Sequence, residues 1–135
     1  MHRTVLVLAS VVLAACGPPS NGDCERDNEC GDYVCARTGE CLPSTSVRSV
    51  RITWTIRGQA ASSSTCATSP NFYLLFLGFD PNDSYGYEPV PCNAGEFFVD
   101  KIPTRYGSVE IGARGGFAVE KVFDSSGNVT FDLMP

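Results

Sequence analysis

The chain has 135 residues, 43% of them hydrophobic, and a formal net charge of −5, from ten Lys and Arg against 15 Asp and Glu. This acidic balance argues against nucleic acid and against anionic lipid surfaces as partners, because both are bound through clustered Lys and Arg. The length suffices for one modest core with a small appendage, but not for two full domains.

Residues 1–15 have the parts of an export signal. Arg3 gives a positive start, residues 5–13 form an apolar run, and the sequence LAAC at residues 13–16 ends it with small residues and a cysteine. The run is shorter than the roughly 20 apolar residues that span a bilayer. The pattern resembles the lipobox of bacterial lipoproteins, which implies that cleavage occurs before Cys16 and that Cys16 carries a diacylglycerol and a further acyl chain such as palmitate.

A lipidated Cys16 would tether the protein to a membrane without spanning it, since two or more acyl chains give lasting attachment. Gly17 follows the cysteine. In the lipoprotein family Asp at that place is the usual inner-membrane retention signal, so the resemblance implies an envelope protein sorted to the outer membrane. The alternative is an ordinary secretory signal whose cleavage site contains a cysteine.

Cleavage of residues 1–15 would also remove Arg3 and the only histidine, His2, leaving nine basic and 15 acidic residues and a net charge of −6. Without histidine, a Ser-His-Asp or Cys-His nucleophile, a zinc hydrolase and a histidine general base become improbable. We therefore expect a protein that is not an enzyme and that holds no cofactor and no metal.

Six cysteines remain after Cys16, an even number in an exported chain, so disulfides are expected. Residues 16–22, the lipidated cysteine and a Pro-rich linker, precede a module at residues 23–43 that has too few large apolar side chains to fold without bridges. Cys66 and Cys92 stand apart, and we expect them to pair with each other. The other four are expected to pair among themselves: Cys24, Cys30, Cys35 and Cys41.

The spacing of these four cysteines is C-x5-C-x4-C-x5-C, with a glycine in each of the two later intervals. It resembles the small Cys-rich repeats of extracellular modules and of many myxobacterial lipoproteins. The resemblance implies a crossed pairing, Cys24 with Cys35 and Cys30 with Cys41. Five carboxylates within residues 23–32 raise the alternative of a Ca²⁺ site, but an acidic run on a small disulfide-rich module is more often a solvated face.

From residue 47 onward the chain has the pattern of strands. Residues 50–57 alternate apolar with Arg or Thr, which predicts a half-buried antiparallel strand with Trp54 in the core. Residues 71–79 are apolar on both faces, as in a central strand covered on both sides. Turn residues at 124–128 predict a hairpin between the last two strands. The remaining predicted strands are residues 96–102, 108–114, 117–123 and 128–133.

With no sustained helical period, these strands predict an all-β fold, an antiparallel β-sandwich over residues 47–135 preceded by the disulfide-rich module. The sandwich resembles the transthyretin-like or carboxypeptidase-regulatory-like domains of myxobacterial lipoproteins, with Ig-like architecture. The resemblance implies a non-catalytic accessory or binding module. The residues that carry it are Trp54, Cys66, Cys92, GEFFV at 95–99, IPTRY at 102–106 and GNVTFDL at 127–133.

Residues 80–91 are predicted to form a long loop that offers a candidate ligand site. Asp80, Asn82, Tyr85 and Tyr87 combine a carboxylate, an amide and two flat amphipathic rings, a mixture typical of sugar or peptide contacts. The spacing of Asp80 and Asn82 is also faintly like a calcium loop. A proline-stiffened loop without a ligand is the favoured alternative.

Three functions fit these patterns. The first is a lipid-anchored module that binds another envelope protein or a glycan, the second a structural envelope component, and the third a small inhibitor or accessory subunit of a secreted hydrolase. An exposed aromatic patch over Tyr85 and Tyr87 would favour the first. A long uncovered sheet edge would favour the second, and a protruding rigid loop between Cys30 and Cys35 the third.

Overall fold

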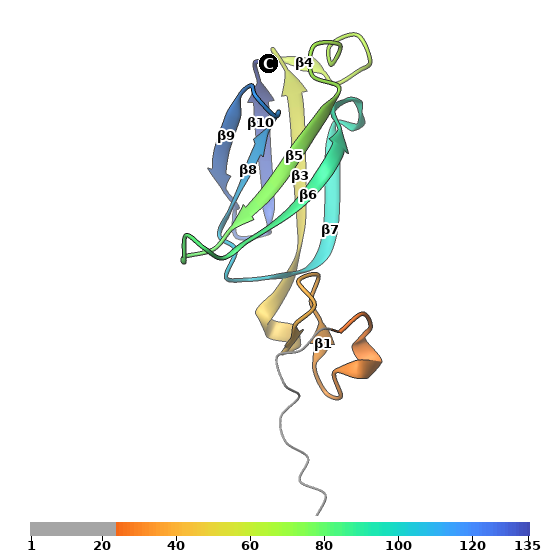
Figure 1. Ribbon diagram of the computed structural model, residues 1–135, viewed down its shortest axis with the longest axis vertical. Coiled ribbons are helices and arrows are strands. Elements are labelled where there is room, and N and C mark those ends of the chain that lie inside the picture. The colour runs from red at the N-terminus through yellow and green to blue at the C-terminus, as the bar shows by residue number, and fades with distance from the viewer. Residues whose placement is uncertain (1–23) are drawn as a thin grey trace, which may run out of the picture.

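The computed structural model describes residues 24–135, which form an all-β protein whose only helices are three short 3-10 turns. A small cysteine-rich module stacks on one end of a two-sheet sandwich (Figure 1). The signal-like segment and Cys16 lie outside the described residues. Within residues 24–135 no helix is long and apolar enough to cross a membrane.

Disulfides hold the module together. It consists of the 3-10 turn η1 (Asp27–Glu29) and a short antiparallel pair, β1 (Val34–Cys35) and β2 (Cys41–Leu42). The bridges join Cys24 to Cys35 and Cys30 to Cys41, the crossed pairing that the resemblance implies. Three of these cysteines are themselves the buried cluster of the module, so the bridges replace a hydrophobic core. Bonded in this way, they have no free thiolate for a metal.

The first sheet is built around β3 (Val47–Ile56), which pairs with β7 (Glu96–Pro103) and β4 (Gln59–Ala60) on one edge and with β10 (Asn128–Leu133) on the other. The pairs with β7 and β4 are antiparallel, as expected, but β10 runs parallel to β3. The turn at residues 124–128 leads from one sheet to the other and is therefore not the predicted hairpin. This crossing leaves β10 pointing in the same direction as β3.

The second sheet has the order β6–β5–β8–β9 and is antiparallel throughout. Its strands are β5 (Asn71–Leu77), β6 (Ser84–Pro91), β8 (Ser108–Gly112) and β9 (Ala118–Val122). The prediction of a loop over all of residues 80–91 was wrong, because residues 84–91 form an edge strand. The ladder accommodates Pro89 through a register shift opposite Phe72 and Leu74, as edge strands do.

The core lies between the two sheets. Trp54 is buried there, as predicted, and its indole Nε1 donates a 2.7 Å hydrogen bond to the carbonyl of Cys92. The Cys66–Cys92 disulfide, which was expected from the sequence, is buried at the same end of the core. From β5, Phe72, Leu74 and Phe76 point inward in alternation.

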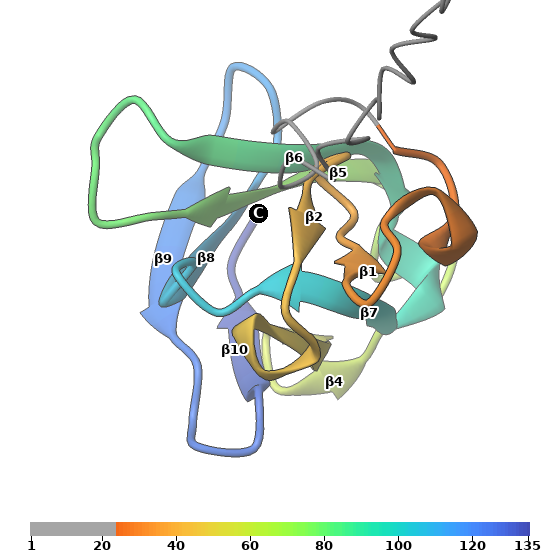
Figure 2. The same cartoon turned by 90° about the horizontal axis from the view of Figure 1, so that it is seen from below.

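Figure 2 views the module and the end of the sandwich from below. Polar contacts fix the one to the other. The backbone N–H of Arg37 donates to the carbonyl of Lys101 at 3.0 Å. Lys101 also reaches Asp27 at 2.7 Å, and its hydrogen bonds lower the pKa of that carboxyl. Across the junction three ion pairs are formed: Asp27 with Lys101, Arg37 with Asp100, and Glu40 with Arg105. The module is therefore docked rather than a loose stalk.

Candidate functional site

The outer face of the second sheet carries the candidate site. Since side chains alternate along a strand, the residues next to the buried Phe72, Leu74 and Phe76 point away from the core. Strand register then places the outward residues in three rows across the sheet. The rows are Ser84, Leu77, Ser108 and Val122; then Gly86, Leu75, Glu110 and Glu120; then Tyr73, Gly112 and Ala118.

The outer side of β5 is apolar, and no other layer of the described residues packs on it. Tyr73, Leu75 and Leu77 are half-buried among their neighbours, and in the first row Val122 is 75% exposed. The sequence predicts a strand covered on both sides, but among residues 24–135 only the inner side is covered. An apolar stripe of this kind on a sheet is normally packed against another layer. The stripe is only partly exposed, but together with the exposed Val122 it forms an apolar surface of the kind that favours an interaction site.

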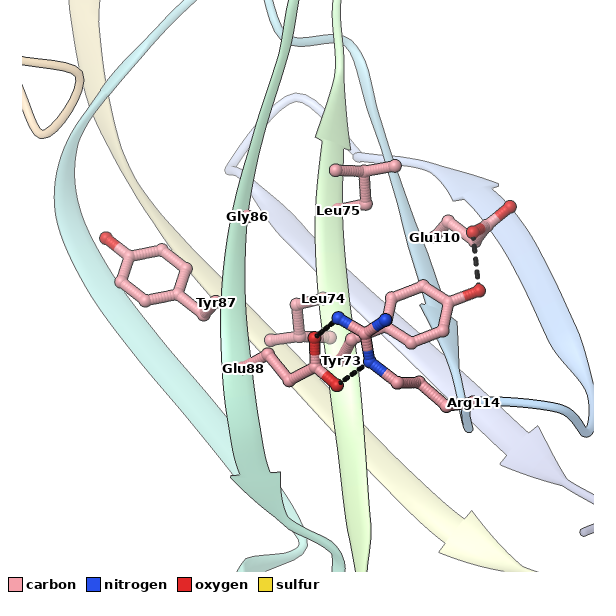
Figure 3. A pocket seen from close by; sticks show the side chains of 8 residues that line it. All are labelled: Tyr73, Leu74, Leu75, Gly86, Tyr87, Glu88, Glu110 and Arg114. Carbon is pink, nitrogen blue, oxygen red and sulfur yellow. Dashed lines mark hydrogen bonds and ion pairs between the residues drawn. The ribbon is translucent and has the colours of Figure 1, made fainter.

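A hollow of about 540 Å³ lies beside this stripe (Figure 3). Gly86 is part of its lining and presents no side chain to it. A Cβ at that position would lie 3.0 Å from the Leu74 carbonyl oxygen and 3.4 Å from Leu75 Cδ1. Glu88 and Arg114 point toward one another at its side, whereas Tyr87 points away from them (Figure 3). The hollow therefore has an apolar floor and a charged border.

Two polar contacts order that border. The Arg114 guanidinium donates from Nε and Nη2 to the two carboxylate oxygens of Glu88, at 2.5 and 2.6 Å, which lowers the pKa of Glu88. The Tyr73 hydroxyl donates to Glu110 at 2.8 Å; burial and this contact raise the pKa of Tyr73. Tyr73 also lies against Gly112, where a Cβ would come within 2.6 Å of the phenol oxygen.

Glu110 and Glu120 stand directly opposite each other on β8 and β9. Like charges in this register destabilise a sheet. Tyr73 donates to the first, and the Ser108 hydroxyl donates to the second at 2.6 Å, but both donors are neutral. In the part of the chain that the structure describes, no Lys or Arg forms an ion pair with either carboxylate. The face therefore carries three carboxylates and one guanidinium.

The four residues singled out at 80–87 do not form one surface. Asp80 and Asn82 lie in an exposed turn, where Asp80 accepts the N–H of Asn82 at 2.9 Å. Tyr85 and Tyr87 are half-buried at the edge of the core, where Tyr87 packs on Phe97 with ring centroids 4.8 Å apart. Burial is the main cause that raises the pKa of Tyr87. The tyrosines are therefore no exposed aromatic patch.

Both edge strands of the second sheet carry side chains that oppose strand addition. β6 carries Pro89 and Pro91, which cannot donate to an added strand. On the opposite edge, Lys121 of β9 reaches across to the Thr130 carbonyl of β10 at 2.8 Å and lies over the Phe131 ring. Lysine at an edge opposes strand addition.

The segment between Cys30 and Cys35 is a tight turn rather than a protruding loop. The Tyr33 N–H donates to the Cys30 carbonyl at 3.0 Å, and the Cys35 N–H donates to Asp27 at 2.9 Å. Tyr33 is 41% exposed. This geometry offers no extended rigid loop for insertion into the cleft of a hydrolase.

In comparisons with known proteins, no family model, no curated protein and no solved structure matches the chain. The site is therefore defined by its own geometry. Sequence reasoning missed Leu75, Glu110 and Arg114 as site residues. The apolar character of residues 71–79 on both faces is a signal that could have found Leu75. Glu110 and Arg114 join it only through the pairing of β5 with its neighbours and through the hollow that Arg114 lines.

Proposed function

We propose that the protein is a lipid-anchored, non-catalytic interaction module of the cell envelope, held in the outer membrane through Cys16. Two sequence features support the proposal: the lipobox at residues 13–16 and the likeness to transthyretin-like lipoprotein domains. The observation that carries it is the half-buried apolar stripe of Tyr73, Leu75 and Leu77 on the outer face of the second sheet, which no other layer of residues 24–135 covers. An apolar stripe on the surface lowers the solubility of a protein, and a role in binding accounts for its presence.

The chemistry of the face supports binding rather than catalysis. Glu88 is tied to Arg114 by two hydrogen bonds, and Glu110 accepts from Tyr73. A general base needs a reactive proton within reach and a nucleophile needs an adjacent base. The hydroxyl of Tyr73, with its raised pKa, is a poor nucleophile at neutral pH. Aliphatic contact area with a few fixed charges is instead what a recognition surface requires.

The anchor is tested by metabolic labelling with a palmitate analogue. We expect the wild-type protein to take up the label and the Cys16→Ser variant to lose it. A second variant, Ser20→Ala, leaves the LAAC sequence intact and serves as the matched control. Equal labelling of wild type and Cys16→Ser would refute the anchor.

The binding role is tested by placing a photo-crosslinking amino acid at single positions in cells that make the protein. Val122, on the outer face of the second sheet, is the test position, and Phe98, 55% exposed on the outer face of the first sheet, is the matched control. We expect crosslinked products from position 122 at several times the yield from position 98. Equal yields, or none from position 122, would refute the outer face of the second sheet as the binding surface.

A further inference from the structure

The outer face of the second sheet is apolar along β5 and negatively charged beside it. Leu75 stands next to Glu110 in register, and Glu110 stands next to Glu120. Leu77 and Val122 flank the two carboxylates in the neighbouring row. A group that covers this face therefore meets aliphatic surface and two adjacent carboxylates together.

We propose that the occupant of this face is a segment of a partner protein in which Lys or Arg side chains stand beside apolar ones. The inference rests on the proposed interaction function and adds the chemistry of the partner. The cation would approach the Glu110 and Glu120 carboxylates, which the fold keeps opposite each other although such a pair destabilises a sheet. Its arrival would turn an unfavourable register into a favourable charge pairing.

The aliphatic surface favours a polypeptide over a glycan. Sugar rings pack well on exposed, flat aromatic rings, and Tyr73 is the only aromatic residue in the three rows. Its hydroxyl is engaged with Glu110, and its ring lies against Gly112. The other contacts on offer are the branched side chains of Leu75, Leu77 and Val122, which match apolar side chains of a protein.

Charge argues against a second copy as the occupant. In a face-to-face dimer with twofold symmetry the same patch is used by both chains. Each copy would present three carboxylates, Glu88, Glu110 and Glu120, and one cation, Arg114, so two negatively charged surfaces would meet. A positively charged partner segment gains from the same arrangement and is attracted to it over about 10 Å at moderate salt.

The test combines the crosslinker at position 122 with a change of charge. In the Glu110→Gln/Glu120→Gln variant the amide oxygens still accept from Tyr73 and Ser108, so the fold is retained while two negative charges are removed. The control is Glu25→Gln/Glu96→Gln, which removes the same net charge from the module and from the first sheet. Circular dichroism spectra of the purified full chain verify that both variants are folded.

We expect the crosslink yield from position 122 to fall at least fivefold in Glu110→Gln/Glu120→Gln and to stay within twofold of wild type in the control. Mass spectrometry should map the crosslink to a segment of another protein that contains Lys or Arg beside apolar residues. Crosslinks to a second copy, to a glycan or lipid, or to a segment without Lys or Arg would overturn the inference. A wild-type yield in the Gln variant would overturn it as well, while leaving the interaction function standing. Absence of any crosslink from position 122 in the wild type would refute both.

Discussion

Replacing Leu74 and Leu75 one at a time by alanine tests whether β5 is covered on one side or on two. The two leucines are neighbours in sequence and in the same strand, so strand propensity and backbone context are matched. Leu74 points into the core and is 1% exposed, whereas Leu75 is half-buried on the outer face. Only the first substitution would leave a closed cavity.

The cavity determines the difference in unfolding free energy. Leu74→Ala should destabilise by about 3 kcal/mol, because buried Leu→Ala changes lose both transfer free energy and packing around the void. Leu75→Ala removes three carbons from a site that water can reach. A fully buried carbon contributes about 0.8 kcal/mol. Because these carbons are only partly buried, we expect a loss of about 1 kcal/mol in unfolding free energy. The difference of about 2 kcal/mol corresponds to about 8 °C in Tm for a domain of this size.

Urea unfolding of the oxidised protein, followed by the fluorescence of the single tryptophan, Trp54, gives both free energies. The slopes should agree with wild type, so that midpoints can be compared directly. Equal destabilisation by Leu74→Ala and Leu75→Ala would mean that the outer face is also a packed core. The outer face would then not be available for binding.

Two further measurements probe the bridges and the junction. Cys66→Ala/Cys92→Ala should lower the unfolding free energy by about 3.5 kcal/mol, because on the chain-entropy model a bridge with a sequence separation of 26 restricts the unfolded chain by that amount. A loss below about 1 kcal/mol in a urea titration would contradict this expectation. Lys101 lowers the pKa of Asp27 from its ordinary value of 3.8. The ion pair therefore stabilises the docked module fully above pH 3.8, and this contribution is lost as the pH falls through the lowered pKa of the folded state. Amide NMR shifts of Arg37 and Lys101 should therefore move together below about pH 3.8, and Lys101→Ala should abolish the effect; constant shifts down to pH 2 would exclude it.

The parts of the fold that depend on local pattern were predictable. Alternation along residues 50–57 identifies β3 and the burial of Trp54, and the isolated positions of Cys66 and Cys92 identify their bridge. β6 was not predicted because prolines, here at 89 and 91, are typical of loops. A strand can contain them here because β6 is an edge strand and its pairing with β5 includes a register shift. The parallel pairing of β10 depends on which sheet the chain enters, which no local pattern encodes.

The candidate site was beyond sequence reasoning for the same reason. Glu110 and Glu120 are ten residues apart, and only the register between β8 and β9 shows that they face each other. Tyr73 meets Glu110 through the pairing of β5 with β8. In the sequence alone the polar residues at 80–87 were the more conspicuous, because a cluster of Asp, Asn and Tyr is recognisable without knowledge of any pairing.

Because the module is docked on the sandwich, it would determine how the outer face of the second sheet is oriented beside a membrane. If Cys16 carries the lipid, the anchor lies only eight positions before Cys24, the first cysteine of the module. Ion pairs such as Asp27 with Lys101 hold the module to the sandwich, and the outer face of the second sheet lies along the side of the long axis (Figure 1). A partner in the same membrane would therefore approach from the side, within a short tether length. Such confinement raises the effective concentration, so that a small face with few charged contacts can still be occupied.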